Sequence, residues 1–474
     1  MRSVIVVACA AMSVMMAMGF PGDEGEKKLE LKVCPLLPVE TKAEKDARMA
    51  WWADARFGMF IHFGLYATLG RHEWVQKYEK IRPEIYEARY KPRFNPDRYN
   101  AQEWVARAKA AGMKYMVLTT KHHEGFCMWD TKTTDFKITD TAFKRDLVRE
   151  YVNACRAAGI KVGFYYSIID WHHPEFQIDT IHPLYDILGK EKASEANKKR
   201  DMAKYRDYMM RQVTELLTEY GKIDIMFFDF THTGYREKGM NDREDYHSEE
   251  LLALVRRLQP QIIVNDRLGL RDTVSGWDMK TPEQVIVPKC PTFNGEDIYW
   301  ETCQTFSGSW GYHRDEDTWK SPRQLLDILI DSVSKKGNLL LNVGPTARGN
   351  FDHRACDRLV AMGEWMDANG RSIYGCTAAP EEFRRQVPEG TRMTYNPKTN
   401  TLYLHILEWP VKVLPITFAD KVAYAQLLHD GSEVQIKQPR HVSGALRTDM
   451  PASLMLPVRK PEVEIPVIEM FLDR

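Results

Sequence analysis

One supersecondary unit recurs along this chain: an amphipathic helix, a glycine or proline stop, and then a strand that is apolar throughout. The clearest copy is DLVREYVNACRAAGIKVGFYYS, in which Asp146 can cap the helix, Gly159 ends it and a strand follows. In the other copies the stop between helix and strand is Gly112, Gly221, Pro260 or Gly337. Strands that are apolar on both faces and alternate with helices predict a parallel sheet covered by helices on both sides.

The number of strands favours a closed barrel over an open sheet. The recurring unit supplies five strands, and FGMFIH (57–62), WDMKT (277–281) and YWETCQTF (299–306) add three more segments. Eight strands over about 320 residues predict a (β/α)8 TIM-like barrel. A dinucleotide-binding open sheet would need a G-x-G-x-x-G motif, which the sequence lacks. The connections around 267–276 and 284–298 have no clear helical pattern, so we expect an irregular barrel.

The pattern of the sequence changes after about Ala379. The remaining segments, such as TLYLHILEWP and VAYAQLLHDG, are short, partly alternating and separated by Pro, Gly, Asn and Asp. This pattern predicts a small antiparallel β-domain. We therefore expect an N-terminal extension over 23–47, a barrel over 48–378 and a C-terminal β-sandwich over 379–474. For the last domain a structural lid packed against the barrel is favoured over an independent sugar-binding module.

Residues 1–22 have the layout of a secretory signal peptide. Arg2 precedes an apolar run over about 4–18, and small and turn-forming residues follow. That run is short for a membrane span, and no other stretch is long and apolar enough to cross a bilayer. The tetrapeptide VVAC (6–9) resembles a lipoprotein cleavage box, but few apolar residues precede Cys9. We expect an exported protein, periplasmic or secreted, with lipidation as the less favoured alternative.

Charge and cysteine usage exclude several classes of partner. Lys+Arg and Asp+Glu number 66 each, so no global field attracts nucleic acid or an anionic membrane. The 12 Trp and 21 Tyr suit flat, amphipathic ligands such as sugar rings. The cysteines beyond the signal are scattered and form no C-x-x-C pair, which predicts neither a disulfide framework nor a zinc ribbon.

Polar side chains follow nearly every predicted strand. In a (β/α)8 barrel the active site lies at the carboxyl ends of the strands, so these side chains should share one rim. Burying so many polar groups together costs free energy unless they find partners, which indicates a ligand site. In chain order the group comprises His62, Glu73, Trp74, His122, His123, Tyr165, Tyr166, Asp170, Asp229, Asn265, Arg267, Thr281, Glu283, Glu301 and Trp310.

Other chemistries find little support in the sequence. A metal-dependent barrel hydrolase uses an H-x-H pair after its first strand, whereas here His62 stands alone between Ile61 and Phe63. His122 and His123 are consecutive, so their side chains diverge on extended backbone and do not readily share one ion. The chain has no G-x-S-x-G nucleophile motif and no Gly-Lys-Ser/Thr phosphate loop.

Paired carboxylates remain as the chemistry that the rim can support. Asp229 follows a strand of Ile, Met and Phe, and Glu283 follows the sixth predicted strand. Two strands apart on a barrel rim, these side chains can face each other across the mouth. Retaining glycoside hydrolysis needs such a pair, a nucleophile and an acid/base about 5–5.5 Å apart.

The ordered motifs together resemble a known enzyme family. They are WWADARFGMFIHFGLYA, KYMVLTTKHHEGFCMWDTKTTDF, VGFYYSIIDWH, IDIMFFDF, VNDR, WDMKTPE, WETCQTFSGSWGY and SKKGNLLLNVGP. Over about 48–378 this set is similar to the α-L-fucosidases of glycoside hydrolase family 29. The resemblance implies a retaining exo-glycosidase that removes terminal α-linked L-fucose from glycans through a covalent fucosyl-enzyme. It also implies that the enzyme needs no metal and no other cofactor.

Matched position by position, the resemblance assigns roles to single residues. It implies that Asp229 is the nucleophile and Glu283 the general acid/base. Phe60 and Trp310 would form an apolar pocket for the fucose methyl and reject the extra hydroxyl of galactose. The family often has Trp two residues before the nucleophile, where this chain has Phe227, which keeps an aromatic face but loses the indole N–H. The implied fucose pocket comprises His62, Glu73, Trp74, His122, His123, Tyr166, Arg267 and Trp310.

Two alternatives stay open at this point. One is a retaining glycosidase for another sugar, an α-L-galactoside or a β-galactoside. The other is a non-catalytic fucose-binding protein on a degenerate barrel, against which the presence of both carboxylates argues.

Overall fold

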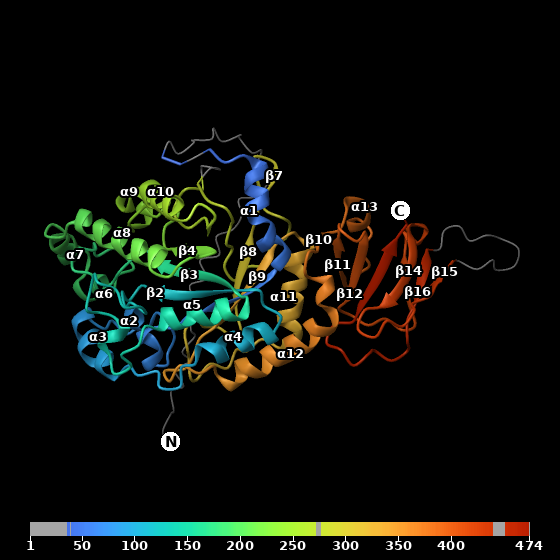
Figure 1. Ribbon diagram of the computed structural model, residues 1–474, viewed down its shortest axis with the longest axis horizontal. Coiled ribbons are helices and arrows are strands. Elements are labelled where there is room, and N and C mark those ends of the chain that lie inside the picture. The colour runs from blue at the N-terminus through green and yellow to red at the C-terminus, as the bar shows by residue number, and fades with distance from the viewer. Residues whose placement is uncertain (1–35, 38, 272–275, 439–450, 474) are drawn as a thin grey trace, which may run out of the picture.

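The computed structural model describes residues 36–37, 39–271, 276–438 and 451–473 (Figure 1). The expected signal peptide and Cys9 lie outside the described residues, as does most of the expected N-terminal extension. Within the described ranges, none of the helices combines the length and the hydropathy of a membrane span.

A seven-stranded parallel sheet forms the centre of the molecule, in the order β5-β4-β3-β2-β1-β9-β8. Every neighbouring pair in this sheet runs parallel. Seven of the eight expected strands are therefore present. They are β1 (Phe57–Ile61), β2 (Tyr115–Lys121), β3 (Lys161–Ser167), β4 (Ile225–Asp229), β5 (Ile263–Val264), β8 (Glu301–Thr305) and β9 (Asn338–Val343).

The remaining expected strand, 277–281, closes the barrel without forming a regular ladder. The N–H of Asp278 donates to the carbonyl of Val264 at 2.8 Å, and the N–H of Lys280 donates to the carbonyl of Tyr299 at 2.9 Å. This segment therefore lies between β5 and β8 and completes the ring. Across the described part of this region, no helix lies between α10 (Ser248–Leu258) and α11 (Pro322–Ser334). The prediction of an irregular (β/α)8 barrel is confirmed.

The helices around the sheet begin and end where the sequence signals predict. In α5 (Leu147–Ala158) the Asp146 side chain accepts a hydrogen bond from the Arg149 N–H, and Gly159 follows at φ 73°. Figure 1 shows these helices outside the sheet, where their apolar faces are buried. The longer ones also include α1 (Lys42–Ala55), α3 (Pro83–Tyr90), α4 (Ala101–Ala110), α7 (Lys190–Asn197), α8 (Met202–Thr218) and α12 (His353–Asn369). The shorter ones are α2 (Val75–Tyr78), α6 (Pro183–Leu188) and α9 (Arg243–Tyr246), whereas α13 (Glu381–Arg384) packs on the core of the C-terminal part.

Alternation along the strands separates two hydrophobic layers. Because successive side chains of a strand point to opposite faces, one set fills the barrel and the other packs against the helices. Phe60, Tyr165 and Phe227 belong to the inner cluster. Tyr166 and Phe228 belong to the outer cluster, which includes the helix side chains. The inner set continues directly into the mouth of the barrel.

The C-terminal part is an antiparallel β-sandwich. One sheet has the order β10-β11-β12-β17-β14 and the other has the order β13-β16-β15. Both contribute to one core, as Leu404, Leu414 and Leu454 illustrate. The strands are β10 (Thr377–Ala378), β11 (Thr391–Asn396), β12 (Thr401–Ile406), β13 (Val413–Ile416), β14 (Val422–Leu427), β15 (Ile436–Lys437), β16 (Ala452–Met455) and β17 (Val467–Leu472).

This sandwich packs against α11 and α12, beyond which it lies in Figure 1. The indole N–H of Trp365 in α12 donates to the carbonyl of Ile465 at 2.7 Å, and Arg323 in α11 donates to the carbonyl of Leu407. The expectation that it packs against the barrel therefore agrees with these contacts. The boundary expected at residue 379 stays a prediction.

Candidate active site

Two carboxylates meet at one guanidinium nitrogen. Asp229 is the last residue of β4, and Glu283 lies in the irregular segment that follows residues 277–281. Nη1 of Arg267 donates to Oδ1 of Asp229 and to Oε2 of Glu283, at 2.8 Å each. Those two oxygens therefore lie no more than twice 2.8 Å apart. A retaining glycosidase requires a separation of about 5–5.5 Å between its two carboxyl groups, which this limit allows.

Asp229 is held as a buried carboxylate. Its Oδ2 accepts a hydrogen bond from the hydroxyl of Tyr165 at 2.8 Å, and its Oδ1 accepts one from the N–H of Phe230 at 2.9 Å. Burial opposes ionisation, but the charge of Arg267 and the hydrogen bonds from Arg267 and Tyr165 outweigh it. The pKa of Asp229 is therefore held below its ordinary value, and the group is ionised near neutral pH.

Glu283 has a different environment. Its side chain is 43% exposed, whereas that of Asp229 is 11% exposed. One carboxylate therefore lies within the barrel mouth while the other faces solvent, where a leaving group and a water molecule could pass. This difference in exposure suits the two different roles of a nucleophile and an acid/base.

Arg267 is positioned by its neighbours on three sides. Its Nε donates to the hydroxyl of Thr281 at 3.1 Å, and its Nη2 donates to the Thr281 carbonyl at 3.0 Å. The ring of Phe227 lies 5.3 Å from the guanidinium carbon. Asp266 in turn accepts hydrogen bonds from the N–H and the hydroxyl of Thr281, at 3.1 and 2.8 Å. The guanidinium that joins the two carboxylates therefore has little freedom to move.

Three buried histidines line the same mouth. Nδ1 of His62 lies 2.7 Å from Oδ1 of Asn342, and Nδ1 of His123 lies 2.8 Å from the Ser167 hydroxyl. Burial lowers the pKa of His62 to about 4 and that of His123 to about 3, and it also lowers the pKa of His122. All three rings are therefore neutral near pH 7, each with one donor and one acceptor nitrogen. Such rings suit the hydroxyl groups of a sugar.

His122 leaves one of its nitrogens unused. Its ring stacks on Tyr165 with centroids 5.7 Å apart, yet its buried Nδ1 has no hydrogen-bond partner among the described residues. A buried polar atom without a partner is costly, so a ligand hydroxyl there would recover free energy.

Aromatic rings form the walls of the mouth. The Phe60 ring lies 4.5 Å from His62, 5.1 Å from Phe227 and 6.0 Å from Trp310. The Trp310 ring lies 5.1 Å from His62. On the other side, the Trp74 ring lies 5.3 Å from His123. The structure thus brings an apolar wall and the imidazoles together.

Glu73 connects two loops of the rim. Its Oε2 accepts a hydrogen bond from the N–H of Gly311 at 2.8 Å, next to Trp310 in sequence. The pKa of Glu73 is raised to about 7, chiefly by burial and in smaller part by the charge of Glu283, while the Gly311 hydrogen bond opposes the rise. Glu73 is therefore partly protonated at neutral pH.

Tyr166 is the one expected pocket residue that does not join this group. Its hydroxyl donates to Oε1 of Gln212 in α8 at 2.8 Å, and its ring lies 4.4 Å from Nζ of Lys121. Alternation along β3 turns Tyr166 toward the helices and Tyr165 into the barrel. Tyr165, which contacts Asp229, occupies the rim instead.

Several rim residues were absent from the expected pocket. Besides Tyr165, they include Phe230, whose ring lies 4.5 Å from His123, and Trp171 at 5.4 Å from His123. Nδ1 of His232 and Nε1 of Trp171 are buried and have no hydrogen-bond partner in the described part of the chain. Closeness in sequence to Asp229 could have indicated Phe230 and His232. The alternation of side chains along β3 could have indicated Tyr165.

No group of three His, Cys, Asp or Glu side chains within the described ranges is arranged to hold a metal ion.

Comparisons with known proteins agree with this geometry. The family model described as Alpha-L-fucosidase matches residues 34–371. Tissue alpha-L-fucosidase of Bos taurus is 29% identical over 380 residues, which cover 76% of this chain and 75% of that protein. The structure of alpha-L-fucosidase isoenzyme 1 from Paenibacillus thiaminolyticus is 40% identical, with a TM-score of 0.81, and the match covers 91% of this chain and 100% of that one. The Thermotoga maritima alpha-fucosidase, in complex with a mechanism based inhibitor, is 28% identical with a TM-score of 0.68, covering 91% and 99%.

Proposed function

The chain belongs to the alpha-L-fucosidase family of glycoside hydrolases, and from this premise we propose a double-displacement mechanism with Asp229 as nucleophile and Glu283 as general acid/base. In this mechanism the enzyme removes terminal α-linked L-fucose from glycans with retention of configuration. The observation that carries the proposal is the contact of both carboxylates with one Arg267 nitrogen, at 2.8 Å each.

In the first step Asp229 attacks the anomeric carbon of fucose. The bond from that carbon to the leaving oxygen breaks, and Glu283 gives its proton to that oxygen. Since Glu283 must carry a proton to do so, its ion pair with Arg267 has to open when substrate binds. Arg267 keeps its bond to Asp229 and so favours the ionised nucleophile.

In the second step the covalent fucosyl-enzyme is hydrolysed. Glu283, now a carboxylate, takes a proton from water, and the resulting hydroxide attacks the anomeric carbon. The ester bond to Asp229 breaks and regenerates its carboxylate. Two inversions at the same carbon give net retention. The exposed position of Glu283 supports this role because the water must reach it from solvent.

Recognition of the sugar falls to the remaining rim. We assign the hydroxyl groups to the neutral rings of His62, His122 and His123, and the C5 methyl to the wall of Phe60 and Trp310. A hydroxymethyl group against that wall would bury a hydroxyl without a partner. Glu73 and Trp74 complete the pocket from the loop after β1, and the ring of Phe227 lies beside the guanidinium of Arg267.

The other candidate functions are less well supported. Family membership does not favour a glycosidase for a different sugar or a non-catalytic binding protein. The Thermotoga maritima alpha-fucosidase forms a complex with a mechanism based inhibitor. Because that enzyme is 28% identical to this chain, its complex supports the proposed mechanism here.

The deciding experiment follows hydrolysis of p-nitrophenyl α-L-fucoside by proton NMR. We expect α-L-fucose to appear first and the β-anomer to grow in only by mutarotation. If the β-anomer appears first, the double displacement is refuted. Faster hydrolysis of p-nitrophenyl α-L-galactoside or β-galactoside would refute the fucose assignment, and no turnover of any of the three would refute the catalytic role.

The proposal extends to export and to domain organisation. Residues 1–22 would be removed on export to the periplasm or the medium, leaving a catalytic barrel over 48–378 and the sandwich over 379–474. N-terminal sequencing of the mature protein tests the first point: a chain that still begins at Met1 in the exported fraction contradicts cleavage. Limited proteolysis near residue 379 tests the second.

A further inference from the structure

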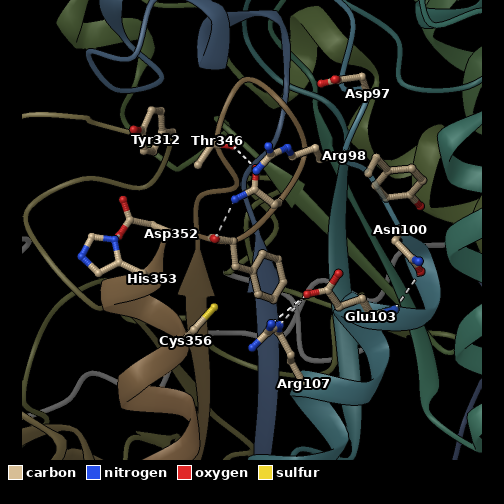
Figure 2. Close-up of a pocket in the computed structure, with 13 residues that line it drawn as sticks. Asp97, Arg98, Asn100, Glu103, Arg107, Tyr312, Thr346, Asp352, His353 and Cys356 are labelled. Carbon is tan, nitrogen blue, oxygen red and sulfur yellow. Dashed lines mark hydrogen bonds and ion pairs between the residues drawn. The ribbon is translucent and has the colours of Figure 1, made fainter.

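A second cavity opens on the barrel rim, away from the two carboxylates. It has a volume of about 880 Å³ and lies where α4 and α12 begin, beside the 346–350 loop (Figure 2). Neither Asp229, Glu283 nor Arg267 lines it. Its walls include Arg98, Tyr99, Asn100, Tyr312, Asn350 and Phe351.

This cavity and the candidate active site share one wall. Residues 310–312 form it: the Trp310 ring lies 5.1 Å from His62, whereas Tyr312 lines the second cavity. The backbone there is packed closely, because a Cβ placed on Gly344 would lie 2.7 Å from the carbonyl carbon of Gly311. The two sites are therefore separated by a single segment of chain, and both open on the same end of the barrel.

The charged side chains of the cavity are nearly balanced. Glu103 pairs with Arg107 at 2.8 Å, Asp97 pairs with Arg348, and Asp352 pairs with Arg354. These three pairs offset one another and leave one positive charge in the lining, that of Arg98, so the net field of the cavity is weak.

Arg98 supplies the donors that remain. Its guanidinium makes no hydrogen bond and no close ion pair to any described residue, although its charge acts on the neighbouring Asp97, and Figure 2 shows it among the residues that line the cavity. A guanidinium presents paired N–H groups, which match two adjacent hydroxyls of a sugar. Tyr312 adds an aromatic face and Asn100 a side-chain amide.

We propose that this cavity is a second carbohydrate site, which takes a neutral, fucose-free portion of a glycan. The inference rests on the proposed function, since such a site serves an enzyme whose substrate is a glycan. A cavity of this volume falls within the range of small-molecule sites, about 300–1,000 Å³, and accommodates a short oligosaccharide. The site would hold a glycan chain next to the pocket in which its fucose is cleaved.

The test measures binding directly, with a ligand that cannot occupy the fucose pocket productively. Lacto-N-tetraose, a neutral tetrasaccharide without fucose, is titrated into the full chain and followed by isothermal calorimetry or saturation-transfer NMR. We expect saturable binding that Arg98→Ala weakens by about 5- to 10-fold, the loss of one bidentate contact. Arg459→Ala, an exposed arginine of the sandwich, should leave binding unchanged.

A second variant addresses the case in which Arg98→Ala folds poorly. Cys356→Trp places a large ring in the cavity from α12 and should abolish binding of the tetrasaccharide. Both variants should hydrolyse p-nitrophenyl α-L-fucoside within about twofold of wild type, because that substrate does not reach the cavity.

The proposal is overturned if wild type shows no saturable binding of the tetrasaccharide. It is also overturned if both variants bind the tetrasaccharide as tightly as wild type does, or if wild type binds inorganic phosphate in place of the saccharide. The proposed function fails separately, through loss of fucoside hydrolysis in the wild-type protein. A chain that binds the tetrasaccharide but does not hydrolyse the fucoside would refute the proposed function and leave the site supported.

Discussion

Asp229 and Glu283, 54 positions apart in the chain, accept hydrogen bonds from the same atom, Nη1 of Arg267, at 2.8 Å each. A cation between two carboxylates lowers the cost of holding both near one another in a partly buried site. Substrate binding has to change this arrangement, because only one of the two carboxyls can keep the cation while the other carries a proton. The guanidinium therefore connects the state of the nucleophile to that of the acid.

Removal of each carboxylate should give a different product with azide. Asp229→Gly should lower kcat on p-nitrophenyl α-L-fucoside by at least about 10³-fold, since the covalent step is lost. Azide can then attack the anomeric carbon once, giving the inverted β-fucosyl azide. In Glu283→Ala, azide intercepts the fucosyl-enzyme and gives the retained α-azide. NMR of the isolated azides distinguishes the two.

A comparison of substrates with good and poor leaving groups provides the control for these two variants. Glu283→Ala should lose much more activity on substrates with poor leaving groups than on aryl fucosides, because only the former need protonation. Equal losses on both would assign the acid to another residue, and Glu73, whose pKa is raised to about 7 by burial, would be the next to test. Circular dichroism confirms that each variant is folded.

Thr281 should act on catalysis through Arg267. Thr281→Val removes the hydroxyl that accepts from Nε of Arg267 at 3.1 Å and donates to Asp266 at 2.8 Å. Arg267 lowers the pKa of Asp229, so a displaced guanidinium lets that pKa rise and leaves less carboxylate at low pH. We expect kcat/KM to fall about tenfold, with the acid limb of its pH profile moved to higher pH.

A matched threonine separates this effect from general destabilisation. Thr302 is buried in β8, where its hydroxyl donates to the Val285 carbonyl at 3.4 Å and accepts from Nε2 of Gln304 at 3.1 Å. Thr302→Val should leave the acid limb where it is. If Thr281→Val lowers activity without moving that limb, then Thr281 acts by some route other than the pKa of Asp229.

Much of the fold follows from short-range signals. The cap at Asp146, the stop at Gly159 and the apolar strands are local features, and each appears where the pattern predicts it. The segment 277–281 is different, because its place in the barrel depends on backbone bonds to β5 and to residues 299–301 rather than on its own composition. A regular strand there was expected, and the structure has isolated bridges instead.

The site could be predicted in outline but not in its connections. Residues after the strands converge because parallel strands end at one rim, which needs no side-chain detail. The choice between Tyr165 and Tyr166 depends on strand parity, and one position of register reverses it. The shared contact of Arg267 depends on the path of the irregular loop that carries Glu283, for which the sequence contains no periodic signal.

The two adjacent tyrosines of β3 offer a direct test of which side chain faces the site. Tyr165→Phe removes the hydroxyl that donates to Asp229 at 2.8 Å, so we expect kcat to fall about tenfold with little change in stability. Tyr166→Phe removes a hydroxyl that donates to Gln212, so kcat should stay near wild type while stability falls by about 1 kcal/mol. Steady-state kinetics and urea unfolding of both variants give the answer, and the reverse pattern would assign Tyr166 to the site.

Stability should fall as the pH rises through neutrality. Glu301 is fully buried and hydrogen-bonded to Tyr115, and burial raises its pKa to about 8. The folded chain therefore keeps a proton that the unfolded chain has lost above about pH 4.5. This contribution to stability is present at low pH and is lost as the pH rises to about 8.

Replacing Glu301 by glutamine removes the titration while keeping the shape. We expect the thermal midpoint of Glu301→Gln to decline less than that of wild type between pH 7 and 8.5, by scanning calorimetry. Buried histidines such as His62 have the opposite dependence, but they act below the ordinary histidine pKa of about 6.5. An identical decline in both proteins would mean that Glu301 is already ionised at pH 7.

The wall formed by Phe60 and Trp310 should set the preference for a methyl group. Fucose and L-galactose differ only in that the latter carries a hydroxyl on C6, which would be buried against apolar rings 6.0 Å apart. Trp310→Ala opens this wall, so the ratio of kcat/KM for the aryl α-L-fucoside to that for the α-L-galactoside should fall by about 10-fold or more. Trp409→Ala, in the sandwich, is the control and should leave the ratio unchanged. If Trp310→Ala reduces both substrates equally, the methyl group is held by other residues and Trp310 serves only to shape the mouth.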